Sequence, residues 1–186
     1  NEMVKLARQL YRDHKKVLDF VVEQGTSNDF SFACETVFGT DLEVYEDVSI
    51  AGSRYIYNHT AAAVISFLPK SWYDAFGSDE YYWHGCDEWW AGFPVICWLQ
   101  LFPRGDKSEA QLRLFAEVGP LVDHGFRSGL INAIIDAAAS KGLRNVSFQR
   151  TATNEGKKFS KFLGKNSLTI EDANDAEEIA AGMEVL

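Results

Sequence analysis

Two strongly apolar runs stand close together in the middle of the chain and read PVICWLQLF (residues 94–102) and QLRLFAEV (residues 111–118). Four residues typical of a turn, Pro103-Arg104-Gly105-Asp106, follow the first run. Apolar runs on either side of such a turn are typical of an antiparallel β-hairpin. We therefore expect a long hairpin over about residues 93–119, at the centre of a sheet.

Further strands are expected on the N-terminal side of this hairpin. Apolar and polar residues alternate over residues 42–50, a second run over residues 54–57 can pair with it, and Pro69 ends a third run over residues 62–68. Apolar residues at three-and-four spacing predict helices, which fall on residues 1–25, 28–38 and 70–76.

The C-terminal part has a mixed, βαβ-like order. Helical spacing over residues 124–140 ends at Gly142, and further elements are expected as a strand at 146–149, a helix at 156–163, a strand at 167–170 and a helix at 174–183. Together these elements predict a single α+β domain over residues 1–186, built on a mainly antiparallel sheet with packed helices. The helix over residues 1–25 could connect it to an upstream domain.

Composition excludes several classes of protein. The 186 residues carry 27 acidic and 18 basic side chains, a net charge of −9, with 46% hydrophobic and 24% charged residues, as in ordinary globular domains. The apolar runs are too short for a membrane span, so no membrane partner is expected. Three scattered cysteines suit a reducing cytoplasm better than a disulfide framework.

Motifs for cofactor binding and covalent catalysis are missing from the sequence. Neither a glycine-rich phosphate loop nor a nucleophile elbow occurs, so we expect no cofactor and no catalytic residue of those kinds. The closest approach to a zinc site is His84 and Cys86, with Cys97 farther along the chain. One short pair is a weak signal for metal, and a loop histidine with small core cysteines is the favoured interpretation, so we expect no metal site.

Metal-dependent nuclease chemistry needs carboxylates that hold cations and a lysine near the attacking water. The triplet Glu155-Gly156-Lys157 lies at a helix start rather than in a buried strand, and Glu117 lies on a suitable strand but no lysine follows it. We therefore expect no nuclease site in these residues. An enzyme with an unrecognised site stays open.

Basic residues concentrate in residues 141–165, whereas six acids and no base follow in residues 171–184. This stretch could neutralise nucleic-acid phosphates, and its candidate contacts are Arg144, Arg150, Lys157, Lys158 and Lys161. Lys157 and Lys161 would share one face of the helix at 156–163. The alternative is that these lysines form only the solvated side of that helix.

Aromatic residues crowd the segment before and within the hairpin. Eleven of the residues from 72 to 102 are aromatic, and all five tryptophans are among them. Such residues in a loop could form a recognition surface for a protein partner, with Tyr82, Trp83, Trp89 and Trp90 as candidate contacts. The alternative is that this loop covers one end of the hairpin.

A family resemblance is carried by residues 6–11 (LARQLY) with His14 and Asp19-Phe20, 117–121 (EVGPL) with Phe126-Arg127, 147–150 (SFQR) and 155–163 (EGKKFSKFL). Together they resemble the C-terminal region of bacterial PD-(D/E)XK nuclease superfamily-like proteins. The resemblance implies that a nuclease core with its aspartate, glutamate and lysine precedes this region, so none of these residues is assigned here.

The leading hypothesis is a cytoplasmic, non-catalytic C-terminal accessory domain of a nuclease-like protein, for substrate positioning or partner recognition. The first alternative is a free-standing protein-interaction module that uses the aromatic loop at residues 81–93.

Overall fold

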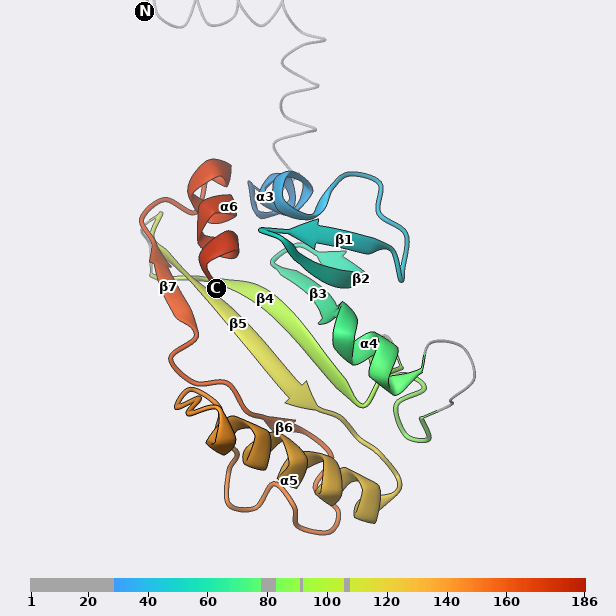
Figure 1. Ribbon diagram of the computed structural model, residues 1–186. Helices are drawn as coiled ribbons and strands as arrows, with labels where there is room; N and C mark the ends of the chain where they lie inside the picture. The colour runs from blue at the N-terminus through green and yellow to red at the C-terminus, as the bar shows by residue number, and fades with distance from the viewer. Residues whose placement is uncertain (1–28, 78–82, 91, 106–107) are drawn as a thin grey trace, which may run out of the picture.

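One antiparallel sheet organises the part of the chain that the computed structural model describes, residues 29–77, 83–90, 92–105 and 108–186. Its seven strands run in the order β1-β2-β3-β4-β5-β6, and β7 also pairs with β5 (Figure 1). The strands are β1 (Asp47–Ile50), β2 (Ser53–Ala61), β3 (Val64–Pro69), β4 (Val95–Pro103), β5 (Ala110–Val118), β6 (Ser160–Lys161) and β7 (Ser167–Ile170). The described helices are α3 (Asp29–Phe38), α4 (Lys70–Phe76), α5 (His124–Ser140) and α6 (Ala176–Val185). This is the expected α+β arrangement; the helix expected over residues 1–25 lies outside the described residues.

The central hairpin is confirmed. β4 and β5 pair along their whole length, from Val95 opposite Val118 to Pro103 opposite Ala110. β4 also pairs with β3, so the hairpin lies in the middle of the sheet.

Alternation along β4 and β5 gives the sheet two different faces. Val95, Cys97 and Leu99 belong to the main core, to which α3, α5 and α6 contribute, and this side is called the helix face. Ile96 and Trp98 point the other way, into a second cluster that includes Phe93 and Trp89, and this side is called the outer face.

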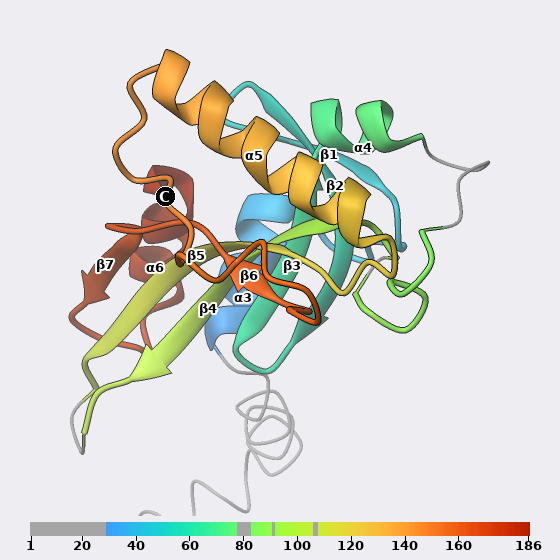
Figure 2. The same cartoon turned by 90° about the horizontal axis from the view of Figure 1, so that it is seen from below.

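Helices cover the two ends of the helix face. α3 and α6 lie side by side over one end, and α5 lies over the other (Figures 1 and 2). α5 begins where the Asp123 carboxylate accepts a hydrogen bond from the Phe126 N–H. It ends at Ser140, and Gly142, the residue expected to close it, has a φ of +66°. No described helix is long and apolar enough to cross a bilayer.

The helix expected over residues 156–163 is absent, which is a correction to the sequence analysis. Ser160 and Lys161 instead form β6 against the end of β5, and the Phe162 N–H donates to the Ala116 carbonyl at 3.1 Å. Burial alternates over these residues, with Ser160 and Phe162 buried and Lys161 exposed. Period-two burial replaces the helical pattern because this segment completes the sheet edge.

Two expected strands are shorter than the sequence predicts. The run at residues 42–50 forms a strand only over β1, because residues 43–46 make a turn in which the Glu46 N–H donates to the Glu43 carbonyl. The strand expected at residues 146–149 is a single bridge between Val146 and Leu163. The strand–helix–strand order after β5 is present, but β6 and β7 pair antiparallel with β5, unlike the parallel strands of a βαβ unit.

Candidate functional site

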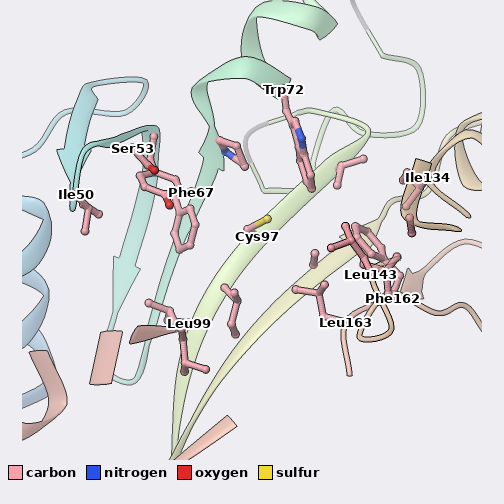
Figure 3. Close-up of a pocket in the computed structure, with 18 of the residues that line it drawn as sticks. Ile50, Ser53, Phe67, Trp72, Cys97, Leu99, Ile134, Leu143, Phe162 and Leu163 are labelled. Atoms are coloured by element: carbon pink, nitrogen blue, oxygen red, sulfur yellow. The ribbon is translucent and has the colours of Figure 1, made fainter. Parts of the chain in front are cut away.

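A groove of about 840 Å³ opens on the helix face between α4, α5 and the end of α6 (Figure 3). Apolar side chains such as Trp72, Leu99 and Phe162 line it, and Lys141 and Glu184 are the charged residues among its lining. The Cys97 thiol also lines it, but burial raises the pKa of this thiol to about 12. The groove can therefore bury apolar surface, and its lining has little capacity for acid–base or nucleophilic chemistry.

A row of aromatic rings crosses the outer face. The Trp90 and Trp98 rings stack with centroids 5.3 Å apart, and Trp98 stacks on Phe115 at 4.9 Å. Phe102 meets Phe115 edge to face at 6.1 Å. Trp98 and Phe115 stand opposite each other on β4 and β5, so the sheet register itself places the centre of the row.

Two cations lie over this aromatic row. The Lys161 Nζ is 5.0 Å from the centre of the Trp98 ring and 4.5 Å from that of Phe115. The guanidinium carbon of Arg113 is 5.2 Å from the centre of the Phe102 ring. Both are within the range in which a cation is attracted to the face of a ring.

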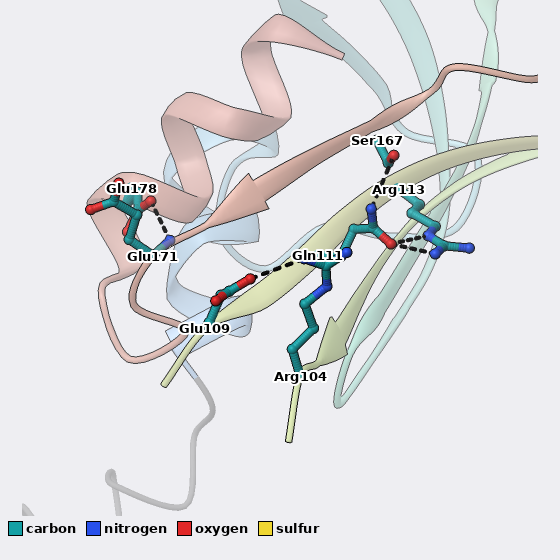
Figure 4. A network of polar contacts seen from close by, with 7 residues as sticks. All are labelled: Arg104, Glu109, Gln111, Arg113, Ser167, Glu171 and Glu178. Carbon is teal, nitrogen blue, oxygen red and sulfur yellow. Dashed lines mark hydrogen bonds and ion pairs between the residues drawn. The ribbon is translucent and has the colours of Figure 1, made fainter. Parts of the chain in front are cut away.

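Arg113 is held in place by its neighbours along the strand (Figure 4). Its Nε donates to Oε1 of Gln111 at 2.7 Å, and the Gln111 amide donates to the Ser167 hydroxyl at 3.2 Å. The rings Trp90, Trp98, Phe102 and Phe115 with Arg113 and Lys161 are called the cation–aromatic surface below.

A buried carboxyl group stands beside this surface. Glu117 pairs with Lys161 in the register of β5 and β6 and is only 9% exposed. Burial raises the pKa of the Glu117 carboxyl, and the positive charges of Lys161, Arg127 and Lys157 oppose that rise only in part. Glu117 is thus a buried carboxyl group close to several cations, next to Lys161 at the edge of the sheet.

Arg127 fixes the segment that carries Lys161. Its side chain is 1% exposed and donates hydrogen bonds to the Gly119 carbonyl at 2.9 Å, the Ala152 carbonyl at 2.7 Å and the Ser160 hydroxyl at 2.8 Å. Burial lowers the pKa of this guanidinium, and Glu117 acts against that shift. One buried side chain on α5 thus connects the end of β5, the turn at residue 152 and β6.

The predicted basic contacts separate into two groups. Lys157 and Lys161 both lie close enough to Glu117 to lower the pKa of its carboxyl, although neither is on a helix as the sequence analysis predicts. Arg144, Arg150 and Lys158 are exposed, and no described contact joins them to the cation–aromatic surface.

The predicted aromatic contacts also divide. Trp83 packs against Phe126 at 5.0 Å, and Trp89 against Phe159 at 6.2 Å, so these two cover the end of the hairpin, as the second interpretation of the loop predicts. Trp90 is 39% exposed and joins the cation–aromatic surface. Tyr82 lies outside the described residues.

The sequence analysis missed Trp98, Phe102, Phe115 and Arg113 as candidate site residues. The signal that could have found them is the alternation of the hairpin, which puts Trp98 and Phe102 on one face of β4, and Arg113 and Phe115 on the same face of β5.

The described residues contain no candidate metal-binding site. They contain no group of three or more His, Cys, Asp or Glu side chains that could hold a metal ion. Glu155 is exposed in a turn, and burial raises the pKa of the Cys86 thiol to about 12.

Compared with family models, curated proteins and solved structures, the chain has no significant match.

Proposed function

We propose that this chain is a cytoplasmic, non-catalytic accessory domain of a nuclease-like bacterial protein and that it positions nucleic acid on the cation–aromatic surface. One observation carries the proposal: Lys161 from the basic stretch lies over Trp98, on which Trp90 from the aromatic segment stacks. Two stretches that are far apart in the sequence thus form a single surface. The resemblance to the C-terminal region of PD-(D/E)XK nuclease-like proteins supplies the nuclease context.

An exposed ring beside cations suits nucleic acid because a base can stack on the open face of Trp90 and the cations can neutralise phosphates. Trp98 is buried and supports the Trp90 ring. Among the described residues, Arg113, Lys157 and Lys161 have no carboxylate oxygen within 4.0 Å, so no ion pair has to break before they contact a phosphate. The ion pairs that the structure shows involve Arg54, Lys70 and Arg104 instead.

The net charge of −9 is compatible with this proposal because the one long stretch that has acids and no base lies away from the surface. Six of the 27 acids fall in residues 171–184, which include most of α6, and α6 packs on the helix face. The cysteines Cys34, Cys86 and Cys97 are free thiols, which supports the cytoplasmic part of the proposal.

The test is binding of labelled DNA and RNA by the whole chain at about 50 mM salt, where the electrostatic contribution is strong. We expect binding that weakens as salt rises. Replacing Lys157 and Lys161 together by Gln should weaken it, and the salt slope on a single strand should fall by about 0.7 for each phosphate that is no longer neutralised. Circular dichroism checks that the double variant is folded.

The matched control is Lys141→Gln, which removes one lysine charge beside the groove on the helix face. It should leave binding unchanged. Absence of binding by the unmodified chain would remove nucleic acid as the ligand. Capture of a protein partner that no longer binds after Trp90→Ala, in place of nucleic acid, would favour the interaction-module alternative.

A further inference from the structure

An open hollow of about 540 Å³ lies next to the cation–aromatic surface, and neither the basic stretch nor the nuclease resemblance accounts for it. Its walls come from three separate parts of the chain. Tyr45 belongs to the turn before β1, Asn58 and His59 belong to β2, and Glu88 and Trp90 belong to the segment before β4. The volume is within the range of small-ligand sites.

Two of the aromatic residues that line the hollow have strained backbones. Tyr45 has a φ of +73° and Trp90 a φ of +49°, which side chains other than glycine rarely adopt. Only five described residues other than glycine have a positive φ, and two of these five line this hollow. Backbone strain of this kind costs about 1–3 kcal/mol per residue and is concentrated at functional sites.

Both strained residues are held firmly and still present ring surface. The Tyr45 N–H donates to the Tyr57 carbonyl at 2.8 Å, and the Trp90 ring stacks on Trp98. Tyr45 is 48% exposed and Trp90 is 39% exposed. Two partly open aromatic rings on strained backbones therefore lie at one hollow, and an open ring face can stack with a planar ligand.

A buried amide adds a polar group with a fixed position. The β2 register shifts between Tyr57 and His59, and Asn58 at this irregularity is only 7% exposed. Its Nδ2 donates to the Ser66 hydroxyl at 2.8 Å, and its Oδ1 has no hydrogen-bond partner among the described residues. The Asn58 amide is therefore held in place through its Nδ2, and its Oδ1 can accept a hydrogen bond from a ligand.

The charged residues in and near the hollow further restrict the class of ligand that can bind there. Glu88 lines the hollow and forms no ion pair with a described residue, so a phosphate is disfavoured inside while an amino group is favoured. Lys161 is not part of the lining but contacts the Trp98 ring on which Trp90 stacks, so this cation can neutralise the phosphate of an adjoining nucleotide. The aromatic rings suit a base, the acceptors on Glu88 and Asn58 suit its amino group, and Lys161 suits a phosphate of the same strand. Together these features fit a nucleobase within a single strand.

We propose that this hollow receives one unpaired nucleobase with an exocyclic amino group, which stacks on Trp90 and donates to Glu88 and Asn58. The inference rests on the proposed function and sharpens it, because it assigns the surface to single-stranded nucleic acid. A base within a duplex cannot enter, since both its faces are stacked and its pairing edge is occupied.

The experiment measures fluorescence anisotropy of the whole chain with labelled oligodeoxycytidine and oligodeoxythymidine of about 12 nucleotides, and with a duplex of the same length. We expect the cytidine strand to bind more tightly than thymidine, which has no amino group, and both to bind more tightly than the duplex. Trp90→Ala should weaken single-strand binding by about ten-fold, and Trp90→Phe should restore most of it.

Two further variants separate stacking from general damage. Glu88→Gln should reduce the preference for cytidine over thymidine without weakening thymidine binding. Phe32→Ala removes a comparably exposed ring from α3 on the helix face and should change nothing. Thermal unfolding of each variant identifies any loss that comes from misfolding, and Trp90→Phe then decides the role of stacking.

The outcomes distinguish the two proposals. Equal binding of duplex and single strand, or full binding by folded Trp90→Ala, would overturn the nucleobase site and leave the nucleic-acid surface standing. No binding of any nucleic acid by the unmodified chain would overturn both.

Discussion

The indole ring of Trp89 occupies the space that a side chain on Gly119 would need: a β-carbon at residue 119 would lie 2.2 Å from Cζ3 of that ring. Gly119 follows directly after β5, and its N–H donates to the Pro94 carbonyl at 2.9 Å, so its backbone has no room to retreat. This close contact holds Trp89, and with it the segment before β4, against the end of the hairpin.

Gly119→Ala should therefore displace Trp89 and destabilise the fold by about 1–3 kcal/mol, the usual cost of overpacking a well-packed site. Denaturant unfolding followed by tryptophan fluorescence measures both effects. Gly129→Ala in α5 is the control because its β-carbon would meet open space, and it should stabilise the protein by about 0.5–1 kcal/mol. An unchanged midpoint for Gly119→Ala would refute this account of the contact.

Arg127→Met should be strongly destabilising. The change leaves the Gly119 and Ala152 carbonyls and the Ser160 hydroxyl without their buried donor, and hydrogen bonds to a charged group are worth about 1.5–3 kcal/mol each. We expect a loss of about 3 kcal/mol or more in the free energy of unfolding. Arg144→Met, at an exposed position, should cost far less, and equal costs for the two variants would contradict the role given to Arg127.

The hairpin could be predicted from sequence because its apolar runs are long and a turn separates them. The element at residues 156–163 could not be predicted in the same way. The spacing of Phe159 and Phe162 fits one face of a helix. In the structure, however, Ser160 accepts a hydrogen bond from the buried Arg127 guanidinium, and the Phe162 N–H donates to Ala116 at the end of β5, so this segment joins the sheet. Tertiary hydrogen bonds of this kind leave no trace in local spacing.

The candidate site could be predicted only in separate pieces. Lys161 and Trp90 both stand out in the sequence, one in a basic stretch and one in an aromatic segment, but their common contact is Trp98, which reads as an ordinary core residue of the hairpin. The hollow depends on a strained Tyr45 backbone and a strand irregularity at Asn58, and neither has a local sequence signal.

Stability should fall as pH rises through the titration range of Glu117. The folded-state pKa of this carboxyl is raised by burial, so between the unfolded and folded pKa values the folded state binds more protons. Proton release then favours unfolding, and the loss is complete above the folded pKa. Glu117→Gln should remove this loss, so the variant should gain stability over the wild type at neutral pH but not at pH values below the unfolded pKa.

Urea unfolding of Glu117→Gln and the wild type across a pH series measures that difference. Glu155→Gln, which replaces an exposed carboxyl, is the control. The Glu117→Gln variant should also bind nucleic acid more tightly, because Lys157 and Lys161 then face no negative charge at residue 117. A Glu117→Gln protein that loses stability at neutral pH would show that attraction to these cations outweighs burial.

The thiols of Cys34, Cys86 and Cys97 should be nearly inert in the folded protein. Burial raises the pKa of each to about 12, and the nearby carboxylates of Glu35 and Asp87 add to the rise at Cys34 and Cys86. The thiolate is the reactive form, so Ellman's reagent at about pH 8 should react slowly until denaturant unfolds the chain. Ser147→Cys places a thiol at an exposed position and should react at once, as an internal control. Cys97 lines the groove between α4 and α5 (Figure 3) and is buried. Rapid labelling of this thiol alone in the folded protein would contradict that burial and would show that reagent reaches it through the groove.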